Sequence, residues 1–250
     1  MTFSDQFSQV ADAYAQRRPR YPDQLFAYLA QVASRHQLAW DCAAGTGQAS
    51  VPLARYFHRV VATDASPTML ARAPRHPQVE YRTATAEASG LEAETVDLVT
   101  VAQALHWLDR EGFYAEADRV LRPGGVLAAW TYGVQVLGDP TLNAVLSRFY
   151  RDTVGPYWPP ERRHVEAGYR SLMFPYPELE TPSFQMEEHW ALDQLLGYVA
   201  TWSATQHFRE AKNRDPVPEL AQALQPLWGE PGSILRVVWP LKLRLGLRPF

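Results

Sequence analysis

The residues 40–50, WDCAAGTGQAS, have the composition of a loop that binds a small molecule. Gly45 and Gly47 allow a ligand to approach the backbone closely at a tight turn leading into a helix. The dinucleotide fingerprint GxGxxG needs Gly or Ala at position 50, where Ser50 stands, so the sequence disfavours NAD. Asp41 would repel a diphosphate and would favour a ligand with an ammonium or sulfonium charge. For the two glycines alone, a plain tight turn is the alternative.

Two further polar residues follow β-rich runs. Asp64 closes the run at 60–63, where an acidic side chain in a Rossmann-like fold accepts the ribose hydroxyls of an adenosine. Its alternative role is to cap the next helix, although Ser66 suits that role better. His106 and Trp107 follow the run at 96–102. The histidine is either a proton acceptor or part of a packed corner, where a backbone carbonyl satisfies it.

These residues need a sheet to bring them together. Between residues 38 and 132, β-rich runs alternate with helical patterns, which is typical of a parallel sheet covered on both faces. The strands are expected at 38–43, 60–63, 79–84, 96–102 and 126–132, with two later ones at about 183–191 and 234–248. The helices are expected at 22–35 from Pro22, at 48–58, at 68–73 after Ser66-Pro67, and at 110–121 between Asp109 and Pro123-Gly124-Gly125.

Composition bounds the remaining choices. The chain has 250 residues, 46% of them hydrophobic, and a formal net charge of -3. This balance offers no excess positive charge to attract nucleic acid or a membrane surface, so we expect a small-molecule partner. One cysteine and no paired histidine or cysteine spacing predict neither disulfides nor a metal site. The chain shows no long apolar span and no signal-like start, which predicts a cytoplasmic protein.

The sequence predicts one domain with distinct segments. Thirteen of the 20 prolines follow residue 132, and the aromatic, proline-rich stretch at 154–177 indicates an ordered lid. We therefore expect N-terminal cap helices at 1–37, a cofactor-binding core at 38–132, a lid or insertion at 133–182, and C-terminal strands and helices at 183–250.

Several segments together resemble the class I S-adenosylmethionine-dependent methyltransferases, in particular the small-molecule group that includes trans-aconitate methyltransferase-like proteins. The resemblance covers about residues 10–132, and the segments that carry it are DCAAGTGQAS at 41–50, VVATDASPTML at 60–70, ATAEASGL at 84–91, VDLVTVAQALHWLD at 96–109 and RVLRPGG at 119–125. It implies an α/β Rossmann-like, doubly wound, mostly parallel sheet of seven strands, with an antiparallel C-terminal strand and a helical or irregular substrate cap. It also implies S-adenosylmethionine as cofactor, S-adenosylhomocysteine as product, and a small methyl acceptor, with a carboxylate among the candidates.

The resemblance also assigns roles to residues of this chain. The residues matched to the cofactor site are Tyr14, Asp41, Ala43, Gly45, Gly47, Gln48, Asp64, Ala65, Met69, Thr85, Ala86, Glu87, Gln103 and Ala104. Two positions depart from the family, since Ala43 replaces the usual first loop glycine and Thr85 stands where Asp is frequent. His106 is the catalytic candidate, as the residue placed to take a proton from an alcohol, phenol or amine. A carboxylate acceptor would need no base.

Three residues are candidates for contacts with the substrate. Arg18, Arg20 and Trp107 are the candidates, because arginine forks suit carboxylates and an indole can form a wall. The pattern favours a surface charge run for Arg162-Arg163-His164, and packing roles for Trp158, Trp202 and Trp228. Two other functions stay open: a noncatalytic module that binds S-adenosylmethionine, and an NAD-dependent oxidoreductase. The sequence does not indicate an oligomeric state.

Overall fold

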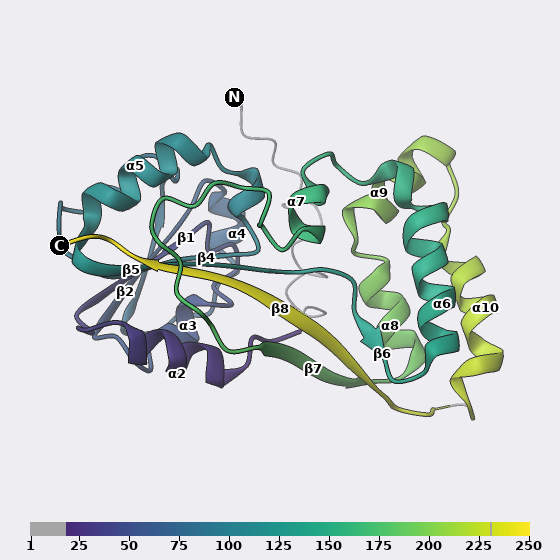
Figure 1. Ribbon diagram of the computed structural model, residues 1–250. Coiled ribbons are helices and arrows are strands. Elements are labelled where there is room, and N and C mark those ends of the chain that lie inside the picture. The colour runs from purple at the N-terminus through teal and green to yellow at the C-terminus, as the bar shows by residue number, and fades with distance from the viewer. Residues whose placement is uncertain (1–18, 231) are drawn as a thin grey trace.

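The computed structural model describes residues 19–230 and 232–250, so the roles predicted for Tyr14 and Arg18 lie outside the described residues. The chain forms one twisted sheet with helices on both faces and a helical cap beyond one end (Figure 1). The strands are β1 (Leu38–Cys42), β2 (Arg59–Asp64), β3 (Val79–Thr83), β4 (Val96–Ala102), β5 (Leu121–Tyr132), β6 (Val136–Leu137), β7 (Phe184–Trp190) and β8 (Leu235–Leu247). The helices of the sheet layer are α2 (Asp23–Val32), α3 (Ser50–Leu53), α4 (Pro67–Leu70), η2 (Leu105–Trp107) and α5 (Arg110–Val120).

The strand order is β3-β2-β1-β4-β5-β8-β6, with β7 paired to β8 outside this path. Strands β1 to β5 pair in parallel, whereas β8 runs antiparallel to β5, β6 and β7. This confirms the predicted doubly wound, mostly parallel sheet with an antiparallel C-terminal strand. The seven expected strands are all present, and the two-residue strand β6 is one that the sequence did not predict.

Alternating side chains along the central strands build a core on each face of the sheet. On β1, Ala39 faces the core that α2 and α3 cover, and Trp40 faces the core that α5 covers. On β5, Ala128 and Trp130 lie in the first core, and Ala129 lies in the second. These strands are therefore buried on both faces, which explains their nearly continuous apolar sequence.

Some predicted helix boundaries were wrong. The helix expected at 48–58 is only the single turn α3, because the next amides, of Arg55 and Tyr56, bond to carbonyls three residues back and form tighter turns. Pro22 is the extended residue before α2 and is not its first helical position. Helix α5 ends at Val120, and Pro123-Gly124-Gly125 lies inside β5, where a bulge interrupts the pairing with β4.

Of the two predicted helix caps, one is confirmed in full and the other only in its position. Ser66 caps α4, since its hydroxyl accepts a hydrogen bond from the Met69 N–H. Asp109 occupies the N-cap position of α5, but its side chain makes no capping hydrogen bond there.

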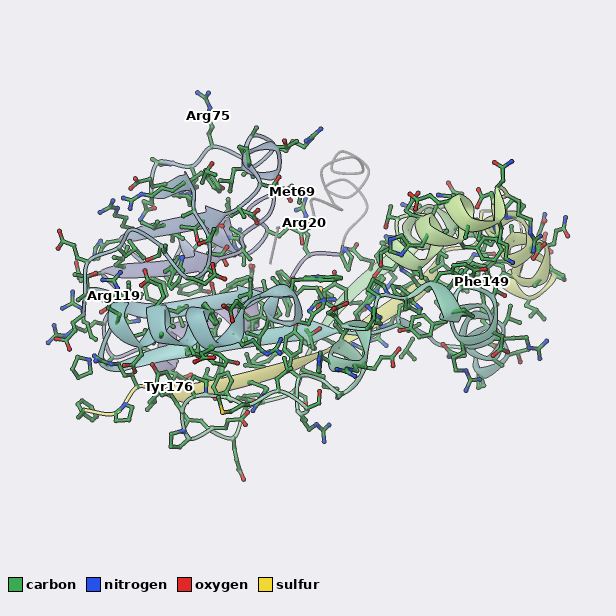
Figure 2. The ribbon with its side chains drawn as sticks, turned by 90° about the horizontal axis from the view of Figure 1, so that it is seen from above. Arg20, Met69, Arg75, Arg119, Phe149 and Tyr176 are labelled. Atoms are coloured by element: carbon green, nitrogen blue, oxygen red, sulfur yellow. The ribbon has the colours of Figure 1, made fainter. Side chains whose placement is uncertain are left out.

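The cap lies beyond the carboxyl ends of the parallel strands (Figures 1 and 2). Its elements are α6 (Pro140–Arg148), η3 (Phe149–Thr153), η4 (Gly155–Tyr157), α7 (Arg162–Glu166), α8 (Leu192–Val199), α9 (Ser203–Lys212) and α10 (Val217–Trp228). They come from both sides of β7, so helices after residue 183 also build it. The core that α2 covers continues into the cap, where it includes Leu224 and Trp228.

Candidate functional site

The predicted site residues meet at one edge of the sheet. Because β1 to β5 run in parallel, their carboxyl ends lie together, and this is the edge where open α/β sheets bind ligands. Asp41 and Asp64 stand at the ends of β1 and β2, and Gln103 directly follows β4.

The loop after β1 has an unusual backbone. Ala43, Gly45 and Gly47 have φ values of 55°, 56° and 77°, in the left-handed region. The alanine that replaces the family's first glycine thus keeps the glycine-like conformation, at a cost of about 1 kcal/mol. A Cβ on Gly47 would come within 2.7 Å of the Tyr81 hydroxyl, so only glycine fits there.

Asp41 supports this loop from beneath. Its side chain is fully buried, and its two oxygens accept hydrogen bonds from Ser50 Oγ at 2.6 Å and Thr100 Oγ1 at 2.9 Å. Burial raises the pKa of Asp41 to about 6, against the lowering effect of these two hydroxyls. The carboxyl group therefore ties the start of α3 to β1 and β4.

Asp64 holds the other side of the same loop. Its Oδ2 accepts from the Gly45 N–H and its Oδ1 from the Ser66 N–H, both at 2.8 Å. Met69 is buried in α4, with its methyl group 3.4 Å from the place of a Cβ on Gly45. Ala65, between the two turns, is half-buried. These contacts join the ends of β1 and β2 into one rigid corner.

The other matched residues lie around this corner. Gln48 is half-buried at the end of the glycine loop, and Ala86 is buried in the turn after β3. Thr85 and Glu87 are exposed beside it.

Gln103 connects β4 to β5. Its Oε1 accepts from Thr131 Oγ1 at 2.6 Å and from the Tyr132 N–H at 2.9 Å, and its Nε2 donates to the Tyr132 carbonyl at 3.0 Å. Its own backbone is left-handed, with φ at 56°. The amide therefore fixes the turn that carries the half-buried Ala104 and the short helix η2.

His106 projects from η2 and is 7% exposed. Its Nδ1 lies 2.9 Å from the hydroxyl of Tyr169, a fully buried residue from the cap side. Burial, with a contribution from the positive charge of Arg162, lowers the pKa of His106 to about 3. The imidazole is therefore neutral at physiological pH.

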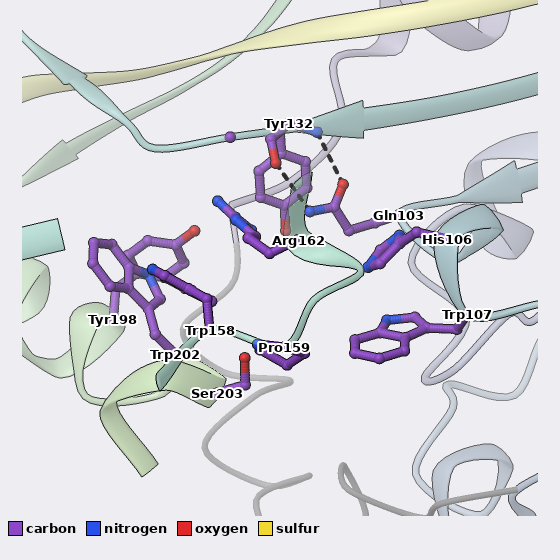
Figure 3. A pocket seen from close by; sticks show the side chains of 11 residues that line it. Gln103, His106, Trp107, Tyr132, Trp158, Pro159, Arg162, Tyr198, Trp202 and Ser203 are labelled. Carbon is purple, nitrogen blue, oxygen red and sulfur yellow. Dashed lines mark hydrogen bonds between the residues drawn. The ribbon is translucent and has the colours of Figure 1, made fainter. Parts of the chain in front are cut away.

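A cavity of about 70 Å³ separates this edge from the cap (Figure 3). Its walls come from the ends of β4 and β5 on one side and from the cap helices on the other. The lining residues are Gln103, His106, Trp107, Tyr132, Gly133, Trp158, Pro159, Arg162, Tyr198, Trp202 and Ser203. Among these described residues none is acidic, and five are aromatic.

Arg162 is the charged residue of the described cavity wall. Its guanidinium group stacks over the rings of Trp158 and Tyr150, at 4.4 and 5.5 Å from their centroids. Its Nε donates to the Tyr150 hydroxyl at 2.8 Å. Within the described chain, the two Nη groups have no carboxylate partner, and the buried Nε1 of Trp158 has no hydrogen-bond acceptor.

Comparison with known proteins identifies the family. A sequence model of the methyltransferase domain matches residues 40–129. A protein of Dictyostelium discoideum named as a methyltransferase is 33% identical over 225 residues, which cover 89% of this chain and 86% of that protein. The chain belongs to the class I S-adenosylmethionine-dependent methyltransferases.

Two further relatives agree with this assignment. A solved structure described as a type II methyltransferase from Anaeromyxobacter dehalogenans has a TM-score of 0.88 and 48% identity, over 93% of this chain and 98% of that one. An uncharacterised methyltransferase of Mycobacterium tuberculosis is 40% identical over 135 residues, which cover 53% of this chain and 54% of that protein. The alternative of an NAD-dependent oxidoreductase is therefore wrong, and S-adenosylmethionine is the cofactor.

The glycine loop of this methyltransferase fits the cofactor. Three alternate left-handed positions at 43, 45 and 47 would let the methionine part of the cofactor approach the backbone closely. The half-buried carboxylate of Asp64 stands beside this loop, and a carboxylate accepts hydrogen bonds of the kind that a ribose diol donates. Among the described residues, no cluster of three potential metal ligands and no helix able to cross a membrane is found.

The cavity residues differ in part from the substrate contacts expected from the sequence. Trp107 lines the cavity, with 39% of its surface exposed, whereas the exposed Arg20 does not line it. Arg162 and Trp158, taken from the sequence as a surface charge and a packing residue, are both cavity residues. A sequence signal existed, because the aromatic pair Tyr157-Trp158 comes shortly before the arginine-bearing helix α7. Only the fold, however, brings that helix against η2 and β5.

Proposed function

We propose that this enzyme transfers the methyl group of S-adenosylmethionine to a small organic acid whose carboxylate is the methyl acceptor. The proposal rests mainly on Arg162, a guanidinium group without a carboxylate partner in an aromatic cavity beside the cofactor edge. Buried donors without acceptors are unfavourable, and a carboxylate oxygen would satisfy both Arg162 and the Trp158 N–H.

The charges of the cavity support an anionic acceptor. Its described walls hold one cation and no anion, so a carboxylate would gain a favourable interaction that a neutral molecule would lack. A carboxylate also attacks without losing a proton, which suits a neutral His106 whose pKa of about 3 makes it a poor base. The tryptophans and tyrosines of the cavity would pack against the apolar body of the acid.

The residues of the chain would act mainly by orientation. The cofactor would supply an electrophilic methyl group on a sulfonium, and its transfer to an acceptor oxygen would leave S-adenosylhomocysteine. Arg162 and Trp158 would hold one carboxylate oxygen so that the other points toward the end of β4. The cap would exclude water from the reacting groups. The core residues at positions 41–48, 64–69 and 85–87 would position the cofactor, as the sequence predicts.

The test compares two neighbouring arginines. Purified enzyme is incubated with labelled S-adenosylmethionine and a panel of small acids, each paired with its amide. We expect label transfer to acids only, and a loss of about 10- to 100-fold in kcat/KM for Arg162→Gln, because charge-assisted hydrogen bonds are removed. Arg163→Gln, at the exposed next position, is the matched control and should keep full activity.

Calorimetry with S-adenosylmethionine separates binding from turnover, since both variants should bind it as the wild type does. Equal transfer to the amides, or full activity of Arg162→Gln, would contradict the acid proposal. Cofactor binding without transfer to any acceptor would favour a noncatalytic module. A cytoplasmic location and the absence of a nucleic-acid partner stay predictions.

A further inference from the structure

The contact between His106 and Tyr169 links the two sides of the cavity. His106 lies at the end of β4, whereas Tyr169 follows α7 in the cap side of the chain, 63 residues later. The Tyr169 ring packs against the imidazole at 5.7 Å between centroids. Within the described residues, the hydroxyl at Nδ1 is the hydrogen-bond partner of the ring, and Nε2 is left for the cavity.

Tyr169 is held in place by an unusual turn. Gly168 and Tyr169 are both left-handed, with φ at 59° and 63°, and this conformation is costly for a tyrosine. Arg244 of β8 donates to the Tyr169 carbonyl at 2.7 Å and to the Leu172 carbonyl at 2.6 Å. Local strain of this kind persists where the surroundings fix it, and it is frequent at functional sites.

The surroundings of the phenol oxygen indicate where its proton goes. The backbone N–H groups of Leu105 and His106, the first of η2, face this oxygen and act to lower the pKa of Tyr169. They are the groups at a helix start that lack partners within the helix. Burial raises the pKa of Tyr169 far above its usual range, so the hydroxyl keeps its proton. Because these N–H groups face the oxygen, its proton is directed toward Nδ1 of His106, which lies 2.9 Å from the oxygen.

We propose that Tyr169 is a positioning residue that fixes the tautomer of His106, so that Nε2 presents an N–H to the methyl acceptor. Neutral imidazole carries one proton, and a phenol donating to Nδ1 leaves that proton on Nε2. His106 is then a hydrogen-bond donor to an acceptor oxygen and not its base. The use of this donor rests on the proposed function. Beside Arg162 and Trp158, the Nε2–H of His106 would be a third hydrogen-bond donor to the negatively charged oxygen of the methyl acceptor.

The competing arrangement reverses the chain of hydrogen bonds. The Thr131 hydroxyl also lies at the phenol, and it already donates to Gln103 Oε1 at 2.6 Å. If Tyr169 donated to Thr131, the proton of His106 would lie on Nδ1 and Nε2 would carry a lone pair. The two arrangements predict opposite protonation of the same ring, so one spectrum separates them.

The experiment records long-range ¹⁵N–¹H spectra of the full-length protein without ligands, with the His106 signals assigned by their loss in His106→Gln. We expect a protonated Nε2 and an unprotonated Nδ1, unchanged between about pH 5 and 8. In Tyr169→Phe the same signals should shift toward a mixture of tautomers. Tyr176→Phe is the matched control, because it removes another buried hydroxyl, bonded to Asp118, away from the cavity.

Activity adds a second readout. With the acid acceptor found as described above, Tyr169→Phe should lower kcat about 3- to 10-fold and leave cofactor binding unchanged. A wild-type spectrum with the proton on Nδ1 would overturn the proposal even if Tyr169→Phe failed to fold, and so would unchanged His106 signals in a folded Tyr169→Phe. If no acid is methylated but the Nε2 proton is observed and depends on Tyr169, the proposed function fails and the positioning role stands.

Discussion

At the scale of single residues, the site combines backbone strain with a buried carboxyl group. Among the described non-glycine residues, five have positive φ, and three of them, Ala43, Gln103 and Tyr169, lie around the site. Asp41 adds an electrostatic cost, because its fully buried side chain has a raised pKa. The hydrogen bonds from Ser50 and Thr100 offset part of that cost. The loop after β1 therefore keeps its conformation at a cost in the free energy of unfolding.

The cost of burying the Asp41 carboxylate should appear as a pH-dependent difference in the free energy of unfolding between Asp41→Asn and wild type. Because the pKa of Asp41 is raised from 3.8 to about 6 by burial, the folded state binds this proton more tightly than the unfolded state does. The stability contribution of Asp41 is thus largest below pH 3.8 and falls as the pH rises to about 6. We expect the free energy of unfolding of Asp41→Asn, relative to wild type, to rise by up to about 3 kcal/mol between pH 4 and 7.5. Urea unfolding at both pH values measures the gap, and a constant gap would contradict this explanation.

At the scale of elements, the segment after α7 depends on β8. Residues 167–172 contain the left-handed pair Gly168-Tyr169, which the helix and strand signals of the sequence do not mark. The buried guanidinium group of Arg244 donates to two carbonyls of this segment, pairs with Glu178 and stacks over Phe174 at 4.7 Å. One side chain on an inner strand therefore shapes the turn beneath His106.

Arg244→Lys should loosen that turn, because a lysine keeps the charge but cannot serve both carbonyls and the carboxylate with one planar fork. We expect a loss of about 2 kcal/mol in the free energy of unfolding, and faster hydrogen exchange in residues 167–178. The control is Arg236→Lys on the same strand, where the exposed pair with Glu187 contributes little. Equal effects of the two variants would contradict a special role for Arg244.

At the scale of the whole molecule, β8 joins the sheet layer to the cap. Its carboxyl-terminal half pairs with β5, and its first half pairs with β7 (Figure 1). The buried Trp239 lies where the two halves meet, packing against Trp190 at 4.9 Å and Tyr198 at 5.4 Å between ring centroids. Its Nε1 donates to the Tyr198 hydroxyl at 3.2 Å. The same hydrophobic core runs from α2 into α10.

A shared core predicts that sheet layer and cap unfold together. Trp239→Ala should lower the free energy of unfolding by about 3 to 5 kcal/mol, because a large buried ring is removed. Tryptophan fluorescence and far-ultraviolet circular dichroism should still report one transition, shifted equally in both signals. Two separated transitions in the wild type would show that the cap folds independently. Unfolding in guanidinium, followed by both signals, is the measurement.

Much of the sheet layer could be predicted because its signals are local. The apolar runs and the small-residue loop mark the strands, and the Ser66-Pro67 cap was confirmed by its hydrogen bond to Met69. Helix lengths were less predictable. The turn after Gly47 stops at Leu53, and the Pro123-Gly124-Gly125 turn is absorbed into β5, since strand pairing outweighs the local preference of those residues.

The sequence by itself determined the fold class, the cofactor and the corner formed by the ends of β1 and β2, because these depend on residues close together in the chain. Only the tertiary structure brought together the cavity residues on which the proposed acceptor site depends. Arg162, Trp158 and Tyr169 meet His106 across more than 50 intervening residues, and the partner of each follows from how the cap packs on the sheet. A guanidinium group or a phenol has the same sequence signal on a solvent-exposed face and in a buried cavity. Burial and neighbours give it a function, and these arise only when distant segments pack together.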